Sequence, residues 1–200
     1  FLTQSSNRIH WFTGQFWVHK KGLARIFGKL SDKIIFYLSH KVLVDSHSQK
    51  KYLIKEHIIS KQKSFVIHKG SLGGVDIKRF RYNKKKRIYL RKKYSVSKDT
   101  FVFLYLGRIN KEKGILELKQ AFKKICNDYN ILLVIVGPIE DKNLYHLSKN
   151  EKKILYFDYT NKPEAWFSFA DILCLPSHRE GFGTVVIEAA SCGIPTLCSN

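Results

Sequence analysis

The chain has 200 residues, 44% of them hydrophobic, and a formal net charge of +20. A chain this long and this apolar can bury a substantial core, which excludes an intrinsically disordered polypeptide. Its longest apolar runs, Phe101–Leu106 and Ile131–Val136, have the length of buried strands and fall far short of the roughly 18 residues that would suggest a membrane span.

The positive charge is concentrated in the first half of the chain. Residues 1–100 contain 24 Lys and Arg against 5 Asp and Glu, whereas residues 101–200 contain 12 against 11, so the net charges are +19 and +1. This asymmetry predicts an anionic partner for the first half, and the candidates are a membrane surface, a nucleic acid or an acidic substrate.

The first half has the pattern of the end of an α/β unit. We expect a helix over residues 23–38, a strand at 42–45, a helix at 48–57 and a strand at 65–68. The turn-rich residues 69–74 then predict a boundary between two domains, 1–73 and 74–200. Lysines and arginines cluster at residues 84–87 and 91–93, which predicts a basic surface helix.

From residue 100 onward, short apolar runs alternate with helical patterns. The expected strands are Phe101–Leu106, Ile131–Val136, Ile154–Phe157 and Ile172–Leu175, and the expected helices cover residues 114–126, 139–147, 163–169 and 184–192. Strands that are hydrophobic on both faces are typical of a parallel sheet covered by helices on each side. The second half is therefore predicted to be a doubly wound α/β domain. The last residues, 195–200, have the pattern of a further strand that has just begun.

The segment from Pro176 to Thr184 follows one strand and opens a helix, which places it at the carboxyl edge of the sheet, where α/β proteins bind ligands. Gly181 and Gly183 allow a ligand to approach the backbone closely, and the helix start directs N–H groups and partial positive charge toward it. Glu180 precedes these glycines. Glu188 lies one turn beyond Thr184, where a carboxylate can accept hydrogen bonds from sugar hydroxyls.

A second cluster follows the strand Phe101–Leu106, at the same edge of the sheet. Arg108 and Lys113 are two cations close to a helix start, so they can hold a diphosphate and stabilise it as a leaving group. Fixed donors aimed at developing negative charge are each worth about 3 kcal/mol of barrier height. The chain contains no D-x-D triplet, so we expect no metal ion and no other cofactor.

These motifs in this order resemble one family, the retaining glycosyltransferases of the GT-B class, family 4. The resemblance covers nearly the whole chain and rests on Gly107-Arg108 with Lys113-Gly114, Ala170-Asp171-Ile172 leading to Pro176-Ser177, Glu180-Gly181-Phe182-Gly183, Glu188-Ala189-Ala190 and Gly193-Ile194-Pro195. Gly74-Val75-Asp76 with Phe80 is similar to the family's interdomain signature. His10-Trp11-Phe12-Thr13-Gly14-Gln15 is similar to a loop in members that build bacterial surface polysaccharides.

The resemblance implies two Rossmann-like domains. The N-terminal one, on the acceptor side, would be only partly present, and the C-terminal one, which holds the nucleotide sugar, would stop before its end. It also implies roles for individual residues: Arg108 and Lys113 contact the donor diphosphate, Glu180 the transferred sugar, Glu188 the ribose, and the backbone of Phe182, Gly183 and Thr184 the phosphates. Gly107 joins the donor-binding residues, and His10 matches a histidine near the donor sugar. Retention is ascribed in this family to front-face attack without a protein nucleophile.

The predicted function is transfer of a sugar from a nucleoside-diphosphate sugar to a lipid-linked or polysaccharide acceptor, with peripheral contact to the cytoplasmic face of an anionic membrane and no role for nucleic acid. Two alternatives remain open. The basic half could belong to a nucleic-acid or anionic-surface binding module, although it contains no helix-turn-helix, zinc or RNP pattern. A GT-B-like nucleotide-sugar epimerase would share the diphosphate site but would need no acceptor.

Overall fold

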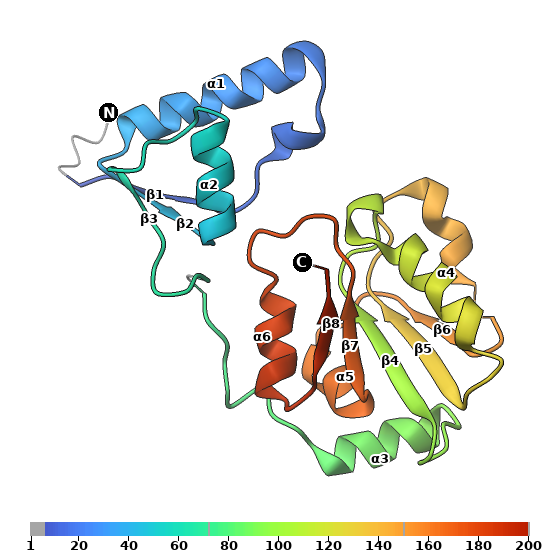
Figure 1. The fold of residues 1–200 in the computed structure, drawn as a ribbon. Coiled ribbons are helices and arrows are strands. Elements are labelled where there is room, and N and C mark those ends of the chain that lie inside the picture. Colours follow the sequence, from blue (N-terminus) through green and yellow to red (C-terminus); the bar gives the residue numbers. More distant parts are fainter. Residues whose placement is uncertain (1–6, 72, 150, 200) are drawn as a thin grey trace. The chain divides into compact units, whose positions relative to one another are not determined.

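The computed structural model describes residues 7–71, 73–149 and 151–199. The chain divides into two compact units, Phe1–Gly73 and Gly74–Asn200. Within these described residues, each unit has its own parallel β-sheet, with three strands in the first and five in the second. Figure 1 shows the two units and the labels of their helices and strands.

The described part of the N-terminal unit, residues 7–71 and 73, forms a parallel sheet of three strands with two α-helices. Its sheet order is β1-β2-β3, and its elements are β1 (Ile9–Phe12), the short 3-10 helix η1 (Phe16–His19), α1 (Gly22–Leu38), β2 (Lys41–Val44), α2 (His47–Lys55) and β3 (Ser64–Phe65). The core of this unit is small and consists of Phe12, Trp17, Val42, Val44, Leu53, Ile58 and Ile59.

Two predictions for this unit were wrong. The segment that begins at His10 was expected to be a loop, but Ile9–Phe12 is strand β1, which pairs in parallel with β2. Only Phe12 of this strand is buried, so the sequence gives only a weak hydrophobic pattern for a strand here. The strand is defined by its pairing with β2. The strand expected at residues 65–68 is limited to Ser64–Phe65, because the ladder with β2 ends at Phe65.

The C-terminal unit is a doubly wound parallel sheet with the strand order β6-β5-β4-β7-β8. Its elements are α3 (Lys84–Lys93), β4 (Phe101–Leu106), η2 (Lys111–Lys113), α4 (Ile115–Ile125), β5 (Ile131–Val136), η3 (Lys142–Ser148), β6 (Ile154–Phe157), α5 (Pro163–Phe169), β7 (Ile172–Leu175), α6 (Thr184–Ser191) and β8 (Thr196–Cys198). The predicted α/β fold of this unit is confirmed. Strands β4, β5, β6 and β7 have the bounds that the sequence predicts. All six residues of β5 are buried, as a strand covered on both faces requires.

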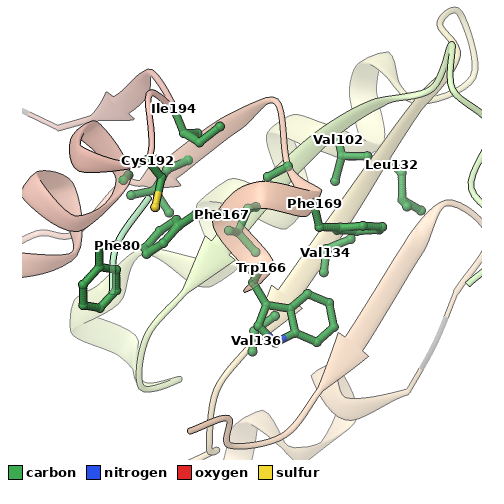
Figure 2. Close-up of a cluster of buried hydrophobic side chains, with 14 residues drawn as sticks. Phe80, Val102, Leu132, Val134, Val136, Trp166, Phe167, Phe169, Cys192 and Ile194 are labelled. Atoms are coloured by element: carbon green, nitrogen blue, oxygen red, sulfur yellow. The ribbon is translucent and has the colours of Figure 1, made fainter. Parts of the chain in front are cut away.

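Two hydrophobic clusters cover the faces of this sheet. Figure 2 shows the first, in which Trp166, Phe167 and Phe169 of α5 pack with Val102, Val134 and Ile194. The second contains Tyr105, Ile109 and Ile115. Because a fully buried large apolar side chain contributes about 1.5–3 kcal/mol, these clusters hold the strands and the loops that follow them in fixed positions.

The helix predicted for residues 139–147 is shorter and of another type. It is the 3-10 helix η3, and it begins only at Lys142, after Asp141 accepts a hydrogen bond from the backbone N–H of Asn143. Ile139 cannot belong to a helix because it forms a parallel β-bridge with Ile109. The pairing of β4 with β5 therefore continues beyond the ends of both strands, and the helix begins later in the chain than predicted.

Helix α3 is basic, but part of its charge is used inside the unit. Arg87 and Arg91 both donate to the carboxylate of Asp171, at 2.6 and 2.8 Å. Arg91 is 6% exposed, and it also donates to the backbone carbonyls of Ser97 and Thr100. The prediction of a basic surface helix is thus wrong for these two arginines, which join α3 to the start of β7.

Candidate functional site

Three loops at the carboxyl ends of neighbouring strands form the candidate site. In a parallel sheet, the ends of β4, β5 and β7 lie at one edge, which is where α/β folds bind ligands. The backbone fixes the first two loops to each other: the Ile109 N–H donates to the Pro138 carbonyl at 2.8 Å, and the Glu140 N–H donates to the Ile109 carbonyl at 3.0 Å. Side chains after β4 and β5 are therefore held at a defined spacing.

The loop after β7 packs against the start of α4 at Gly114. This glycine has φ of +64°, and a Cβ placed there would lie 1.9 Å from the carbonyl oxygen of Pro176. Only glycine combines the left-handed conformation with such a close approach. A hydrogen bond of 2.8 Å from the His178 N–H to the Glu112 carbonyl joins the same two loops.

Lys113 and Glu180 form a short, half-buried ion pair between these loops. The Lys113 Nζ lies 2.6 Å from Glu180 Oε1, and the two side chains are 15% and 28% exposed. Ser177 Oγ donates to the same carboxylate oxygen at 2.8 Å. Charge-assisted bonds of this length are strong and directional, so both side chains have fixed positions in the absence of ligand.

Arg108 is paired with Glu140, which follows β5. The Arg108 NH1 lies 3.0 Å from one oxygen of Glu140, and the Asn110 side-chain amide donates to the other at 2.9 Å. Burial raises the pKa of the Glu140 carboxyl, but the hydrogen bonds from Asn110 and Arg108 outweigh it and leave the pKa below its ordinary value. The Arg108 side chain is 63% exposed, so an anionic ligand can reach it from solvent.

A pocket of about 240 Å³ lies where these loops meet. It is lined by Tyr105, Leu106, Gly107, Arg108, Lys113, Leu175, Glu180, Gly183, Thr184 and Val185. Helix α6 begins at this pocket with Gly183 as its N-cap, at φ of +74° and with no side-chain capping bond. The first N–H groups of a helix have no intrahelical acceptor and carry partial positive charge, so this helix start suits an anion.

Tyr105 forms the inner wall of the pocket. Its side chain is fully buried, and its hydroxyl donates to the carbonyl of Arg108 at 2.7 Å. Burial raises the pKa of this phenol, and the negative charge of Glu180 raises it further. Tyr105 therefore stays neutral and acts on the site by fixing the backbone that carries Arg108.

The structure gathers most of the residues predicted for the site, but not all of them. Gly107, Arg108, Lys113, Glu180, Gly183 and Thr184 line one pocket. Phe182 belongs to the same loop but is not a lining residue. Glu188 lies on α6 and is half-buried, also outside the lining; burial raises its pKa, and the charge of Arg79 offsets part of that rise. His10 lies in β1 of the N-terminal unit, where its ring packs edge to face on Phe12 at 4.5 Å.

Three contributors were missed by sequence reasoning: Glu140, Ser177 and Tyr105. Glu140 follows the glycine and proline that end β5, so a search for charges at the ends of neighbouring strands would have found it. Tyr105 lies inside an apolar strand, and its sequence pattern carries no separate signal. Among residues 7–71, 73–149 and 151–199, no group of three or more His, Cys, Asp or Glu side chains is arranged to hold a metal ion.

The pocket offers cations and N–H donors to a ligand, and its two cations are already balanced by carboxylates. An incoming dianion such as a diphosphate can replace Glu140 at Arg108 and share Lys113 with Glu180. Such an exchange brings no new cation into the pocket, because Arg108 and Lys113 are both held in place before the ligand arrives. The chemistry available here is therefore recognition and stabilisation of a phosphate-like anion.

Comparison with known proteins assigns the chain to a protein family. The family model for "Glycosyl transferases group 1" matches residues 86–200, more than half of the chain. The capsular polysaccharide biosynthesis glycosyltransferase CapM of Staphylococcus aureus is 30% identical over 207 residues, which cover 100% of this chain and 54% of CapM. The chain thus spans about half of the length of this relative.

Solved structures show the same fold at low sequence identity. HepE of Anabaena in complex with UDP-glucose has a TM-score of 0.76 and 17% identity, covering 95% of this chain and 52% of that one. WaaG, a glycosyltransferase involved in lipopolysaccharide biosynthesis, has a TM-score of 0.73 and 17% identity, covering 96% and 56%. The α/β fold with parallel sheets, as in GT-B glycosyltransferases, that the sequence predicts is confirmed by these matches.

Proposed function

Because the chain belongs to the group 1 glycosyl transferases, we propose that its protein transfers a sugar from a nucleoside-diphosphate sugar to a lipid-linked or polysaccharide acceptor. The observation that carries this proposal is the convergence of Arg108, Lys113 and the start of α6 on one pocket. Two cations and a helix N-terminus are the groups that a diphosphate needs, both as a bound donor and as a leaving group.

In the proposed complex, Arg108 and Lys113 contact the diphosphate, and the backbone of Phe182, Gly183 and Thr184 donates to its oxygens. As the sugar–phosphate bond breaks, negative charge grows on the departing diphosphate. Arg108 and Lys113 are fixed by Glu140 and Glu180 before that moment, so they stabilise the charge without a large reorganisation. Each such donor is worth about 3 kcal/mol of barrier height.

Glu180 and Glu188 have binding roles in this proposal. Glu180 holds hydroxyls of the transferred sugar, and Glu188 holds the ribose. The pairing of Glu180 with Lys113 and Ser177 makes it a poor covalent nucleophile. This supports a family 4 reaction that retains the anomeric configuration by front-face attack, with no metal ion or other cofactor.

We further propose that residues 1–73 belong to the acceptor-side domain, that residues 74–200 hold the donor, and that His10 lies near the donor sugar in the complete enzyme. Among the described residues, no helix is both long and apolar enough to span a bilayer. The excess of +19 in residues 1–100 supports peripheral contact with the anionic cytoplasmic face of a membrane, since each Lys or Arg near such a surface contributes about 1 kcal/mol.

A donor panel on the full-length enzyme tests this function. Release of nucleoside diphosphate is measured for each nucleotide sugar, with and without a polysaccharide or lipid-linked acceptor, for the wild type and for Arg108→Ala and Glu188→Ala. We expect acceptor-dependent release from one donor and a large loss in both variants. Turnover that needs no acceptor would indicate an epimerase instead, and unimpaired donor use by both variants would contradict the assigned site.

A further inference from the structure

The cations that line the pocket, Arg108 and Lys113, belong to ion pairs of unequal strength. Lys113 and Glu180 lie 2.6 Å apart, their side chains are 15% and 28% exposed, and Ser177 adds a hydrogen bond to the same carboxylate. Arg108 and Glu140 lie 3.0 Å apart, and their side chains are 63% and 40% exposed. Because water screens an exposed ion pair, Arg108 can leave its carboxylate at a much lower cost than Lys113 can.

The carboxylate of Glu140 is held in place by groups other than Arg108. The side-chain amide of Asn110 donates to its second oxygen at 2.9 Å. The backbone N–H of Glu140 donates to the Ile109 carbonyl at 3.0 Å, one residue after Ile139 bridges to Ile109. The strands that lead into these two loops, β4 and β5, are neighbours in the sheet (Figure 1). Glu140 therefore stays at the site when Arg108 turns away from it.

Arg108 can exchange Glu140 for a ligand by a movement of its side chain alone. Arg108 is one of the residues that line the pocket, and Glu140 is not. The hydroxyl of the buried Tyr105 donates to the Arg108 carbonyl at 2.7 Å, which fixes the main chain at this position. A long, exposed side chain on a fixed main chain moves between staggered rotamers, so the guanidinium can turn from the carboxylate toward the pocket.

The negative charge of Glu140 also acts on the interior of the pocket. Burial raises the pKa of the Glu140 carboxyl, but hydrogen bonds from Asn110 and Arg108 leave that pKa below its ordinary value, so the group is ionised near neutral pH. Burial and the charge of Glu180 raise the pKa of the Tyr105 phenol, and the charge of Glu140 raises it further. The carboxylate is thus close enough to influence charges along the inner wall.

A carboxylate in this position opposes the product of the proposed reaction more than its donor. The diphosphate of a nucleotide sugar carries about two negative charges. The nucleoside diphosphate that remains after sugar transfer carries nearly three, because its terminal phosphate has a second ionisation with a pKa of about 6. Like charges repel in proportion to their size, so Glu140 repels the product more strongly than it repels the donor.

We propose that Glu140 is an exchangeable counter-ion of Arg108, which holds the guanidinium in the unliganded enzyme, yields it to the diphosphate of the donor, and takes it back as the nucleoside diphosphate leaves. Glu140 is a positioning residue, because it acts on the ligand through Arg108. The inference rests on the proposed function and adds to it the residue that balances donor binding against product release.

Calorimetric titration of the full-length protein with UDP, GDP and ADP tests the proposal. The nucleotide that binds the wild type most tightly is then titrated into Glu140→Gln, Glu140→Asp and Glu117→Gln. Glu117 is a matched control, since it is an exposed carboxylate that pairs with His178 and with neither cation of the pocket. We expect Glu140→Gln to bind about five- to tenfold more tightly than the wild type, because a competing carboxylate and a like charge are both removed. Glu117→Gln should bind as the wild type does.

Steady-state and burst kinetics of the same variants, with the donor that turns over, separate positioning from structural support. For Glu140→Gln we expect a lower KM, a lower kcat and a burst of product in the first turnover, because release of the nucleoside diphosphate becomes limiting. Glu140→Asp keeps the charge and should return the affinity toward that of the wild type.

The direction of the change in affinity decides between the two roles of Glu140. Weaker nucleotide binding by Glu140→Gln would mean that Glu140 only supports the loop, and unchanged binding would mean that it does not compete for Arg108; either result would overturn the proposal. If the wild type turns over a donor and the affinity of Glu140→Gln is unchanged, this inference fails and the proposed function stands. A wild type that binds none of the three nucleotides and turns over no donor would overturn both.

Discussion

The ammonium group of Lys113 lies 2.6 Å from a carboxylate oxygen of Glu180, although 67 positions separate the two residues in the chain. Lys113 ends the loop after β4, and Glu180 belongs to the loop after β7. The pair therefore joins the loops that follow two neighbouring strands, and both of its residues line the pocket. In the absence of ligand, it neutralises the cation that we propose for the donor diphosphate.

Lys113→Ala should weaken binding of the donor's nucleoside diphosphate by about 10- to 100-fold, because a hydrogen bond to a charged group is worth about 1.5–3 kcal/mol. The substitution also leaves the carboxylate of Glu180 without its cation, next to the negatively charged phosphates of the ligand. Isothermal titration calorimetry measures the change. Lys111→Ala, an exposed lysine of the same 3-10 helix, is the matched control and should bind as the wild type does. Equal affinities for both variants would contradict the role of Lys113.

Gly114→Ala should lower the free energy of unfolding of the C-terminal unit by about 2–4 kcal/mol. The positive φ alone costs about 1 kcal/mol, and the overlap of the new Cβ with the Pro176 carbonyl adds about 1–3 kcal/mol. Gly193→Ala separates the two effects, since Gly193 also has a positive φ, +71°, but has nothing within 4 Å of its Cβ position. Guanidinium titration should show a loss of only about 1 kcal/mol for that control. Similar losses in both variants would mean that the close approach at Gly114 does not matter.

Asp171→Asn should destabilise the C-terminal unit by about 3 kcal/mol, since removing one partner of a buried ion pair leaves the other charge uncompensated. The Asp171 carboxylate accepts from Arg87, Arg91 and the backbone N–H of Val102, all within 2.8 Å. Asp99 is an exposed aspartate of the loop before β4. The same guanidinium titration with Asp99→Asn should show almost no change in the free energy of unfolding. An unchanged midpoint for Asp171→Asn would show that the two arginines find other partners.

Glu151 should make stability depend on pH in the acid range. Hydrogen bonds from Lys119 and Lys123 lower its pKa from 4.5 to about 2. A carboxyl whose pKa is lower in the folded protein than in the unfolded protein contributes stability at pH values above the unfolded pKa. That contribution is lost as the pH falls through the pKa of the folded protein. Its contribution is thus complete above about pH 4.5 and gone near pH 2. Glu151→Gln should be less stable than the wild type at pH 7, and the two midpoints in urea should converge as the pH approaches 2. A constant difference across that range would contradict the prediction.

The order of strands and helices in the C-terminal unit follows from the sequence, because runs such as Ile131–Val136 are apolar on both faces and end at a glycine. The same pattern places Arg108, Lys113, Glu180 and the start of α6 at one edge of the sheet, since parallel strands share their carboxyl ends. It does not say which charges pair. Glu140 meets Arg108 only because the β4–β5 ladder continues through Ile109 and Ile139.

The sequence by itself therefore determined the fold class, the bounds of strands β4 to β7 and the edge of the sheet at which the charged loops meet, because hydrophobic periodicity and turn residues act over a few neighbouring positions. Only the tertiary structure decided the ion pairs, the closeness of Gly114 to Pro176 and the orientation of α1. An amphipathic helix has the same periodicity whether its apolar face points inward or outward. In α1, the contacts of Gly28 and Asp32 with Trp17, made by residues distant in the sequence, turn that face to the outside.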